Sequence, residues 1–215
     1  MKNKKLLNYS DYLQLEKILS GQDLMSAKRG TPAHDEMLFI IVHQVYELWF
    51  KQILHELDSV ITIFKQESII ESDVSFVVLR LQRIIEIQKI LIDQIRVLET
   101  MTAMDFLEFR DDLFPSSGFQ SAQFRLMENK LGLLNDQRIM YSGKDYTSVL
   151  KEEEKSTVQN SEQEKSLFEL LESWLERTPF LSFKGFDFWI QYSKAVRSML
   201  KKEKLVIQNN TNYSQ

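Results

Sequence analysis

The clearest apolar pattern covers residues 34–58, which also hold all three histidines of the chain. One helical face has apolar side chains at three-to-four residue spacing, namely Val42, Tyr46, Trp49, Ile53 and Leu57. A second, mostly apolar stripe lies beside the first and consists of Met37, Ile41, Val45, Leu48 and Gln52. Because a helix that is apolar on most of its surface is normally buried, the pattern predicts a long buried helix covering Met37 to Ile61.

A second long helix is predicted from about Val74 to Leu98. Helical spacing relates its positions Val77, Leu81, Ile84, Ile85, Gln88, Leu91, Ile92 and Ile95. Two consecutive helices of this length can pack as an antiparallel hairpin. The centre of the fold is therefore expected to be this hairpin.

Shorter helices are predicted on both sides of the hairpin. Before it, Ser10 can cap a helix that Gly21 ends, and residues 20–33 are expected to form a loop. After it, Thr102 and Asp105 match a capping pattern and begin a helix to about Leu113. Further helices are expected at 120–131, 167–175 and 187–202.

Two segments are too polar to suggest a packed element. Residues 142–165 are the least hydrophobic stretch, and a solvated surface segment or the flank of a mobile loop is expected there. The second polar segment is the tail, residues 208–215, which is rich in asparagine. No segment shows the alternating pattern of a strand. The sequence therefore predicts an all-α helical bundle with long antiparallel helices, with one domain over 1–205 and a disordered tail over 206–215.

Composition narrows the classes of protein that fit this bundle. The 6 glycines and 3 prolines in 215 residues favour long helices, and the absence of cysteine excludes disulfides and thiolate metal sites. A net charge of −4 argues against a nucleic-acid surface. No apolar run is long enough to span a membrane, and the basic start lacks the apolar core of a signal peptide. A cytoplasmic protein without a membrane or nucleic-acid partner is expected.

The histidines do not form a metal site. His43 and His55 are twelve residues apart, roughly 18 Å along a straight helix, so they cannot bind one ion together. Phe39 lies four residues before His43, so the two rings share a helical face. The segment alone favours a buried histidine whose ring is satisfied by a hydrogen bond over a functional one.

A second candidate group is found at Phe106 and Arg110, which are also four residues apart. An arginine beside an aromatic ring can bind a carboxylate with its planar guanidinium. The alternative is a surface arginine that pairs with Glu108, Asp111 or Asp112. On this fragment alone, the alternative has the stronger support.

Four segments together resemble the tryptophan 2,3-dioxygenase family, whose members are haem enzymes that open the indole ring of tryptophan. They keep the family's order and cover most of the chain: YSDYLQLEKIL (9–19), HDEMLFIIVHQVYELWFKQILHELD (34–58), DFLEFRDDLFPSSGFQSAQFRLMENKLGL (105–133) and ERTPFLSFKGFDFW (176–189). The resemblance implies haem as the cofactor and L-tryptophan and dioxygen as the substrates. It also implies assembly as a homo-oligomer, or as a complex with a chain that carries the rest of the pocket.

The resemblance also implies roles for particular residues. His43 stands at the distal histidine that accepts a hydrogen bond from the indole N–H, and Phe39 and Phe106 at positions that line the indole pocket. Arg110 stands at the arginine that binds the substrate carboxylate. The loop near a haem propionate corresponds to Ser117 and Gly118. A segment that enters a neighbouring subunit's pocket corresponds to Tyr9, Tyr12 and Leu13.

One family feature has no counterpart in this sequence. The proximal histidine that ligates the haem iron lies in a later helix of the family, and none of the three histidines here matches it. Three interpretations follow: a dioxygenase whose proximal half is supplied by a second polypeptide, an inactive fragment without haem, or a non-enzymatic helical module that binds a ligand or a partner. The retained pocket residues favour the first over the third, whereas the missing ligand favours the second or third for this chain in isolation.

Overall fold

The structure is a computed structural model that describes residues 7–134, 137–138, 145–177, 182–183 and 186–209. The chain divides into two compact units, Met1–Leu167 and Phe168–Gln215. The single domain expected over 1–205 therefore stays a prediction.

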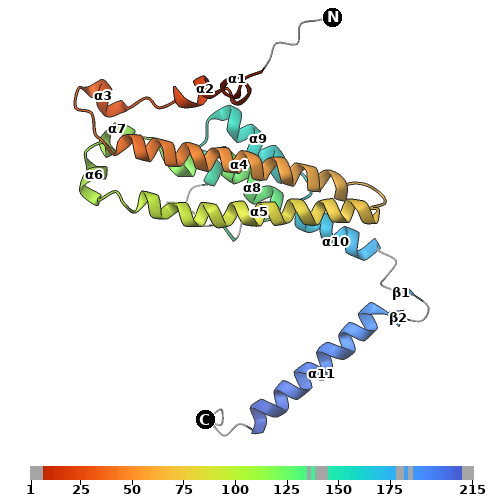
Figure 1. Cartoon of the computed structure of the whole chain (residues 1–215). Helices are drawn as coiled ribbons and strands as arrows, with labels where there is room; N and C mark the ends of the chain where they lie inside the picture. Colours follow the sequence, from red (N-terminus) through yellow and green to blue (C-terminus); the bar gives the residue numbers. More distant parts are fainter. Residues whose placement is uncertain (1–6, 135–136, 139–144, 178–181, 184–185, 210–215) are drawn as a thin grey trace, which may run out of the picture. The chain divides into compact units, whose positions relative to one another are not determined.

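The first unit is built on two long helices, α4 (Glu36–Phe64) and α5 (Glu71–Leu98). They run antiparallel and side by side, as the sequence predicts (Figure 1). Their facing apolar stripes form the core together with a residue of α8 (Ala122–Leu131), and this core consists of Phe50, Ile53, Leu57, Ile84, Ile87, Leu91 and Met127. Burial of apolar surface at this hairpin is the main stabilising term of the unit.

Helices α8 and α9 (Glu152–Glu162) add a further layer, because α8 packs on α4 and α9 packs on α8. The short helix η3 (Tyr146–Val149) lies beside α9. Most of the residues described between 145 and 165 are exposed, as expected for a solvated surface segment, but they form η3 and α9 instead of the flank of a loop. Val158 is fully buried, and the side-chain amide of Asn129 donates to its carbonyl oxygen at 3.1 Å.

The N-terminal segment is more broken than expected. Instead of one helix from Ser10 to Leu19, it holds α1 (Tyr9–Leu13) and α2 (Leu15–Leu19), which are separated by Gln14 in the left-handed region at φ 54°. Asn8 caps α1 instead of Ser10. The expected loop at 20–33 contains the additional helix α3 (Met25–Arg29).

The segment after α5 also differs from one continuous helix. It contains α6 (Ala103–Leu107), α7 (Arg110–Leu113) and η1 (Gly118–Gln120). Thr102 and Asp105 form the expected capping box at the start of α6. In Figure 1, α3, α6 and α7 lie together at the end of the hairpin where α4 begins.

The second unit contains most of α10 (Leu167–Arg177), the two-residue strands β1 (Ser182–Phe183) and β2 (Phe186–Asp187), and α11 (Phe188–Asn209). The strands pair antiparallel and are the only ones among the described residues. The all-α class is thus confirmed. Helix α11 includes 206–209 of the expected tail, and residues 210–215 lie outside the described part of the chain.

Candidate functional site

Four rings from α4 and the α6–α7 segment form an aromatic cluster, namely Phe39, His43, Phe106 and Phe109. The Phe39 and His43 centroids are 4.1 Å apart. The ring of Phe39 lies 5.8 Å from that of Phe106 and 5.6 Å from that of Phe109. Phe109 is 0% exposed and meets Phe106 edge-on at 5.5 Å. The structure therefore brings together three residues that the sequence selects and adds Phe109.

The break between α6 and α7 explains why Phe109 was missed. The capping box holds the start of α6, and the hydrogen bonds from Thr102 hold the pKa of the Asp105 carboxyl below its usual value. Helix α6 ends at Leu107, and α7 begins at Arg110. Phe106 and Arg110 therefore do not share one helical face, and the spacing argument that paired them is wrong. The turn between the helices directs Phe109 inward, and the sequence offers no signal for it beyond a third aromatic residue in the segment.

His43 is half-buried, and its Nδ1 atom lies 2.7 Å from the carbonyl oxygen of Phe39. A carbonyl oxygen can only accept, so Nδ1 carries the proton. In the neutral ring, Nε2 is then an acceptor. The ring can thus receive a hydrogen bond from a ligand N–H group at Nε2.

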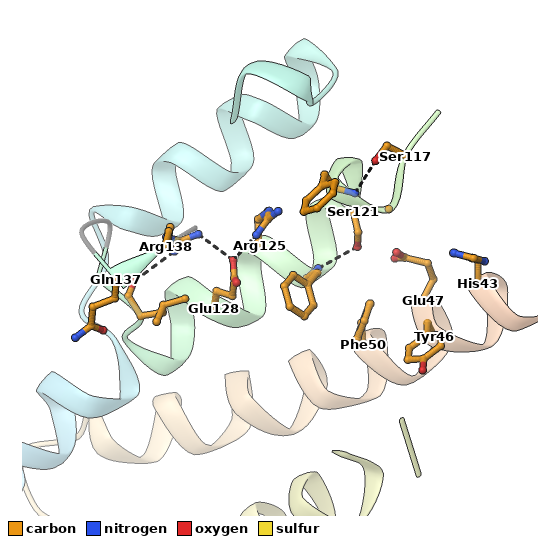
Figure 2. Close-up of a pocket in the computed structure, with 14 residues that line it drawn as sticks. His43, Tyr46, Glu47, Phe50, Ser117, Ser121, Arg125, Glu128, Gln137 and Arg138 are labelled. Atoms are coloured by element: carbon orange, nitrogen blue, oxygen red, sulfur yellow. Dashed lines mark hydrogen bonds and ion pairs between the residues drawn. The ribbon is translucent and has the colours of Figure 1, made fainter. Parts of the chain in front are cut away.

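His43 also lines a cavity of about 610 Å³ between α4, η1 and α8 (Figure 2). Ser117 and Gly118 line the same cavity, whereas Phe39, Phe106 and Arg110 are not among its lining residues. The apolar part of its wall consists of Tyr46, Phe50, Phe119, Phe124 and Leu133. Its volume suits a small-molecule or cofactor site.

The end of the cavity away from His43 carries two arginines, Arg125 and Arg138. Arg125 and Arg138 both pair with the carboxylate of Glu128, at 2.9 and 3.0 Å. The Arg138 guanidinium also lies 4.2 Å from the ring centre of Tyr146. Burial, together with a hydrogen bond to Glu162, raises the pKa of Tyr146 to about 12. The tyrosine therefore stays neutral beside the arginines.

The lining residues fit the ring and the edge of a haem group but not its iron. The buried Nε atoms of Arg125 and Arg138 have no hydrogen-bond partner among the described residues, and N–H groups of this kind suit the carboxylates of a flat apolar cofactor. His43 is the only histidine in this lining. His34 and His55 are exposed. No group of three or more metal-ligating side chains occurs in the described part of the chain.

The remaining candidates lie on the surface. Arg110 is exposed, and its side chain makes no hydrogen bond or ion pair among the described residues. Asp112, one of its expected surface partners, pairs instead with Arg29. Tyr9, Tyr12 and Leu13 lie on α1, and all three are exposed. In the part of the chain that the structure describes, no helix is both long and apolar enough to cross a membrane.

Comparison with known proteins gives a match along nearly the whole chain. The profile of the family described as tryptophan 2,3-dioxygenase matches residues 2–215. The chain is 51% identical to a tryptophan 2,3-dioxygenase of Dictyostelium discoideum, over 96% of the chain and 52% of that protein. It is 53% identical to one of Alteromonas mediterranea, over 91% of the chain and 54% of that protein. For one of Rattus norvegicus, the identity is 51% over 94% of the chain and 50% of that protein. The chain spans about half the length of the curated relatives it matches.

Proposed function

The chain belongs to the tryptophan 2,3-dioxygenase family, and we propose that it forms the distal half of a haem pocket in which the indole ring of L-tryptophan is opened to N-formylkynurenine. The observation that carries this proposal is the contact of Phe39, His43 and Phe106 in one aromatic cluster. The cluster offers flat apolar surface and one hydrogen-bond acceptor. An indole needs both of these, because it has a flat apolar ring and a single N–H donor.

Each residue of the pocket has a separate part in this proposal. His43 accepts the indole N–H at Nε2, since its Nδ1 proton is used by the carbonyl of Phe39. The rings of Phe39 and Phe106 pack against the indole and keep water from it. The exposed guanidinium of Arg110 binds the substrate carboxylate. Together these contacts would hold the substrate in one orientation, which lowers the entropic part of the barrier.

Haem is the cofactor of this proposal. Ser117 and Gly118 would lie near one of its carboxylates, and the orphaned N–H groups of Arg125 and Arg138 would serve the same edge. When bound, ferrous haem supplies the activation of dioxygen. Nothing in the described residues matches the family's proximal ligand, so that ligand comes from the half of the family's length that these 215 residues do not span.

Assembly completes the proposed pocket. The exposed side chains of Tyr9, Tyr12 and Leu13 on α1 would enter the pocket of a neighbouring copy. The complete enzyme is a cytoplasmic oligomer or a complex with a chain that carries the proximal half. The alternatives of an inactive fragment and of a non-enzymatic binding module have less support, because Phe39, His43, Phe106 and Arg110 are retained in a chain about 50% identical to tryptophan 2,3-dioxygenases.

Complementation tests the proposal. The chain is co-expressed with the C-terminal half of the Alteromonas mediterranea relative, supplied with haem, a reductant and L-tryptophan in air, and the N-formylkynurenine formed is measured by absorbance and mass. The C-terminal half alone is the control. Product that depends on the chain, and that falls in Arg110→Ala, supports the proposal. A complex that binds haem and tryptophan but forms no product would contradict it.

A further inference from the structure

The Arg29 side chain, on the last turn of α3, contacts both sides of the break between α6 and α7. Its Nη2 donates to the carbonyl oxygen of Glu108 at 2.9 Å, and its Nη1 lies 3.1 Å from the carboxylate of Asp112. The Nε donates to the hydroxyl of Thr31 at 2.9 Å. Glu108 and Asp112 stand two positions before and two positions after Arg110. The guanidinium of Arg29 therefore connects the two chain segments that flank Arg110.

The break has two acceptors that bind the Arg29 guanidinium, the Glu108 carbonyl and the Oδ1 of Asp112, whereas the buried Oδ2 of Asp112 accepts no hydrogen bond among the described residues and has only the charge of Arg29 beside it. Carbonyls at the end of a helix lack partners within that helix, and Glu108 is the C-cap residue that directly follows α6. The Asp112 side chain is only 15% exposed, and a carboxylate that is mostly removed from water needs a cation or donors beside it. Only the planar, forked guanidinium of an arginine suits both partners at once.

Helix α3 is in turn fixed to the start of α4 by Glu36. Glu36 is 0% exposed, and its carboxylate accepts from the backbone N–H groups of Met25 at 2.7 Å and of Ser26 at 3.0 Å. It also accepts from the Ser26 hydroxyl, whose oxygen accepts from the Ala33 N–H at 2.9 Å. Glu36 lies three residues before Phe39 and seven before His43. Hydrogen bonds therefore connect the helix that carries these two rings, through α3, to the segment that carries Arg110.

We propose that Arg29 is a positioning residue that sets the separation between the aromatic cluster on α4 and the guanidinium of Arg110. This inference rests on the proposed function, in which the cluster binds the indole and Arg110 binds the carboxylate of one amino-acid substrate. The contact also neutralises Asp112, an acidic neighbour of Arg110 that would otherwise repel an anionic substrate group. Arg29 thus contributes to selection of substrates that carry both an indole and a carboxylate.

The affinities for two ligands test this role. The complex of this chain with the C-terminal half of the Alteromonas mediterranea relative is titrated with L-tryptophan and with tryptamine, which lacks the carboxylate. Arg29→Gln should weaken L-tryptophan binding roughly ten-fold and leave tryptamine binding within about two-fold. Arg29→Lys should give an intermediate result, because a lysine can pair with Asp112 but cannot also reach Glu108 in the same geometry. The matched control is Lys28→Gln, which removes an exposed cation of the same helix that pairs with Asp23 and should change neither affinity. An equal loss of affinity for L-tryptophan and for tryptamine in Arg29→Gln would show a structural role only and overturn the inference.

Hydrogen exchange on the full chain alone separates this inference from the proposed function. The backbone N–H groups of residues 108–112 should exchange faster in Arg29→Gln than in the unchanged chain, with no such change in Lys28→Gln. Unchanged exchange at these residues would overturn the positioning role whether or not tryptophan binds. If the exchange changes as expected but the complemented protein binds neither ligand, Arg29 still braces the segment and the proposed function is what fails.

Discussion

The Nδ1 atom of His43 lies 2.7 Å from the carbonyl oxygen of Phe39, one helical turn earlier in α4. This bond fixes which ring nitrogen carries the proton, since the carbonyl has none to give. It also restrains the ring beside Phe39, whose centroid is 4.1 Å away. A neutral His43 held in this way presents Nε2 as an acceptor toward a bound indole.

His43→Ala should lower turnover in the complemented enzyme and leave haem bound. The substitution removes one hydrogen bond that orients the indole, and a bond of this kind contributes about 0.5–1.5 kcal/mol, or up to roughly ten-fold in rate. Product formation measures the first effect and the Soret band the second. His55→Ala, an exposed position on the same helix, is the control and should change neither. Loss of haem in His43→Ala would identify His43 as an iron ligand.

Arg110→Ala should weaken binding of L-tryptophan by about 1.5–3 kcal/mol, one to two decades in affinity, because it removes a charge-assisted contact to the carboxylate. Binding of tryptamine should stay the same. Calorimetric titration of the complemented protein measures both affinities. Arg96→Ala, a well-exposed arginine on α5, should leave them unchanged. Unchanged tryptophan affinity in Arg110→Ala would remove the carboxylate role.

Phe109→Ala should destabilise the chain by roughly 3–5 kcal/mol, the usual cost of truncating a fully buried phenylalanine. Its ring contacts the rings of both Phe39 and Phe106. The matched control is Phe168→Ala, since Phe168 is 58% exposed and its loss should change stability by less than about 0.5 kcal/mol. Urea denaturation measures both. Equal midpoints would contradict the burial of Phe109.

The sequence predicts the long helices well because their evidence is local. The apolar stripes of 34–58 and 74–98 identify α4 and α5 within a few residues, and Thr102 and Asp105 locate the start of α6. Contact between the rings of Phe39 and His43 follows from helical spacing alone. The family roles of these residues stay predictions.

The elements that were missed depend on contacts far along the chain. The sequence of helix α9 is almost entirely polar, because α9 buries only Val158 where it packs on α8. Helix α3 exists in a loop-like sequence because Glu36 binds its first N–H groups from ten or more residues away. The break before Arg110 is held by Arg29, 79 positions from its partner Glu108. Periodicity reports none of these contacts.

Alkaline pH should destabilise the fold in part through Tyr146. Burial raises the pKa of Tyr146 to about 12 from an ordinary value of 10.0. The stabilisation from this neutral tyrosine is complete below pH 10 and is lost between about pH 10 and 12, because the unfolded chain releases the proton first. In Tyr146→Phe, the free energy of unfolding should therefore fall less steeply between pH 9 and 11. Urea denaturation at pH 9 and at pH 11 measures the free energy of unfolding of both proteins. The same decrease between the two pH values in Tyr146→Phe and in the unchanged chain would contradict the raised pKa.

Haem titration tests the central claim, that this chain carries one half of a haem pocket, most directly. The purified chain is titrated with haem, first alone and then together with the C-terminal half of the Alteromonas mediterranea relative. The Soret band of histidine-ligated iron is followed in both titrations. We expect no stoichiometric complex with the chain alone and a tight one with both halves. A tight complex of the chain alone that is lost only in His34→Ala or His55→Ala would contradict the claim, because one of these exposed histidines would then supply the ligand.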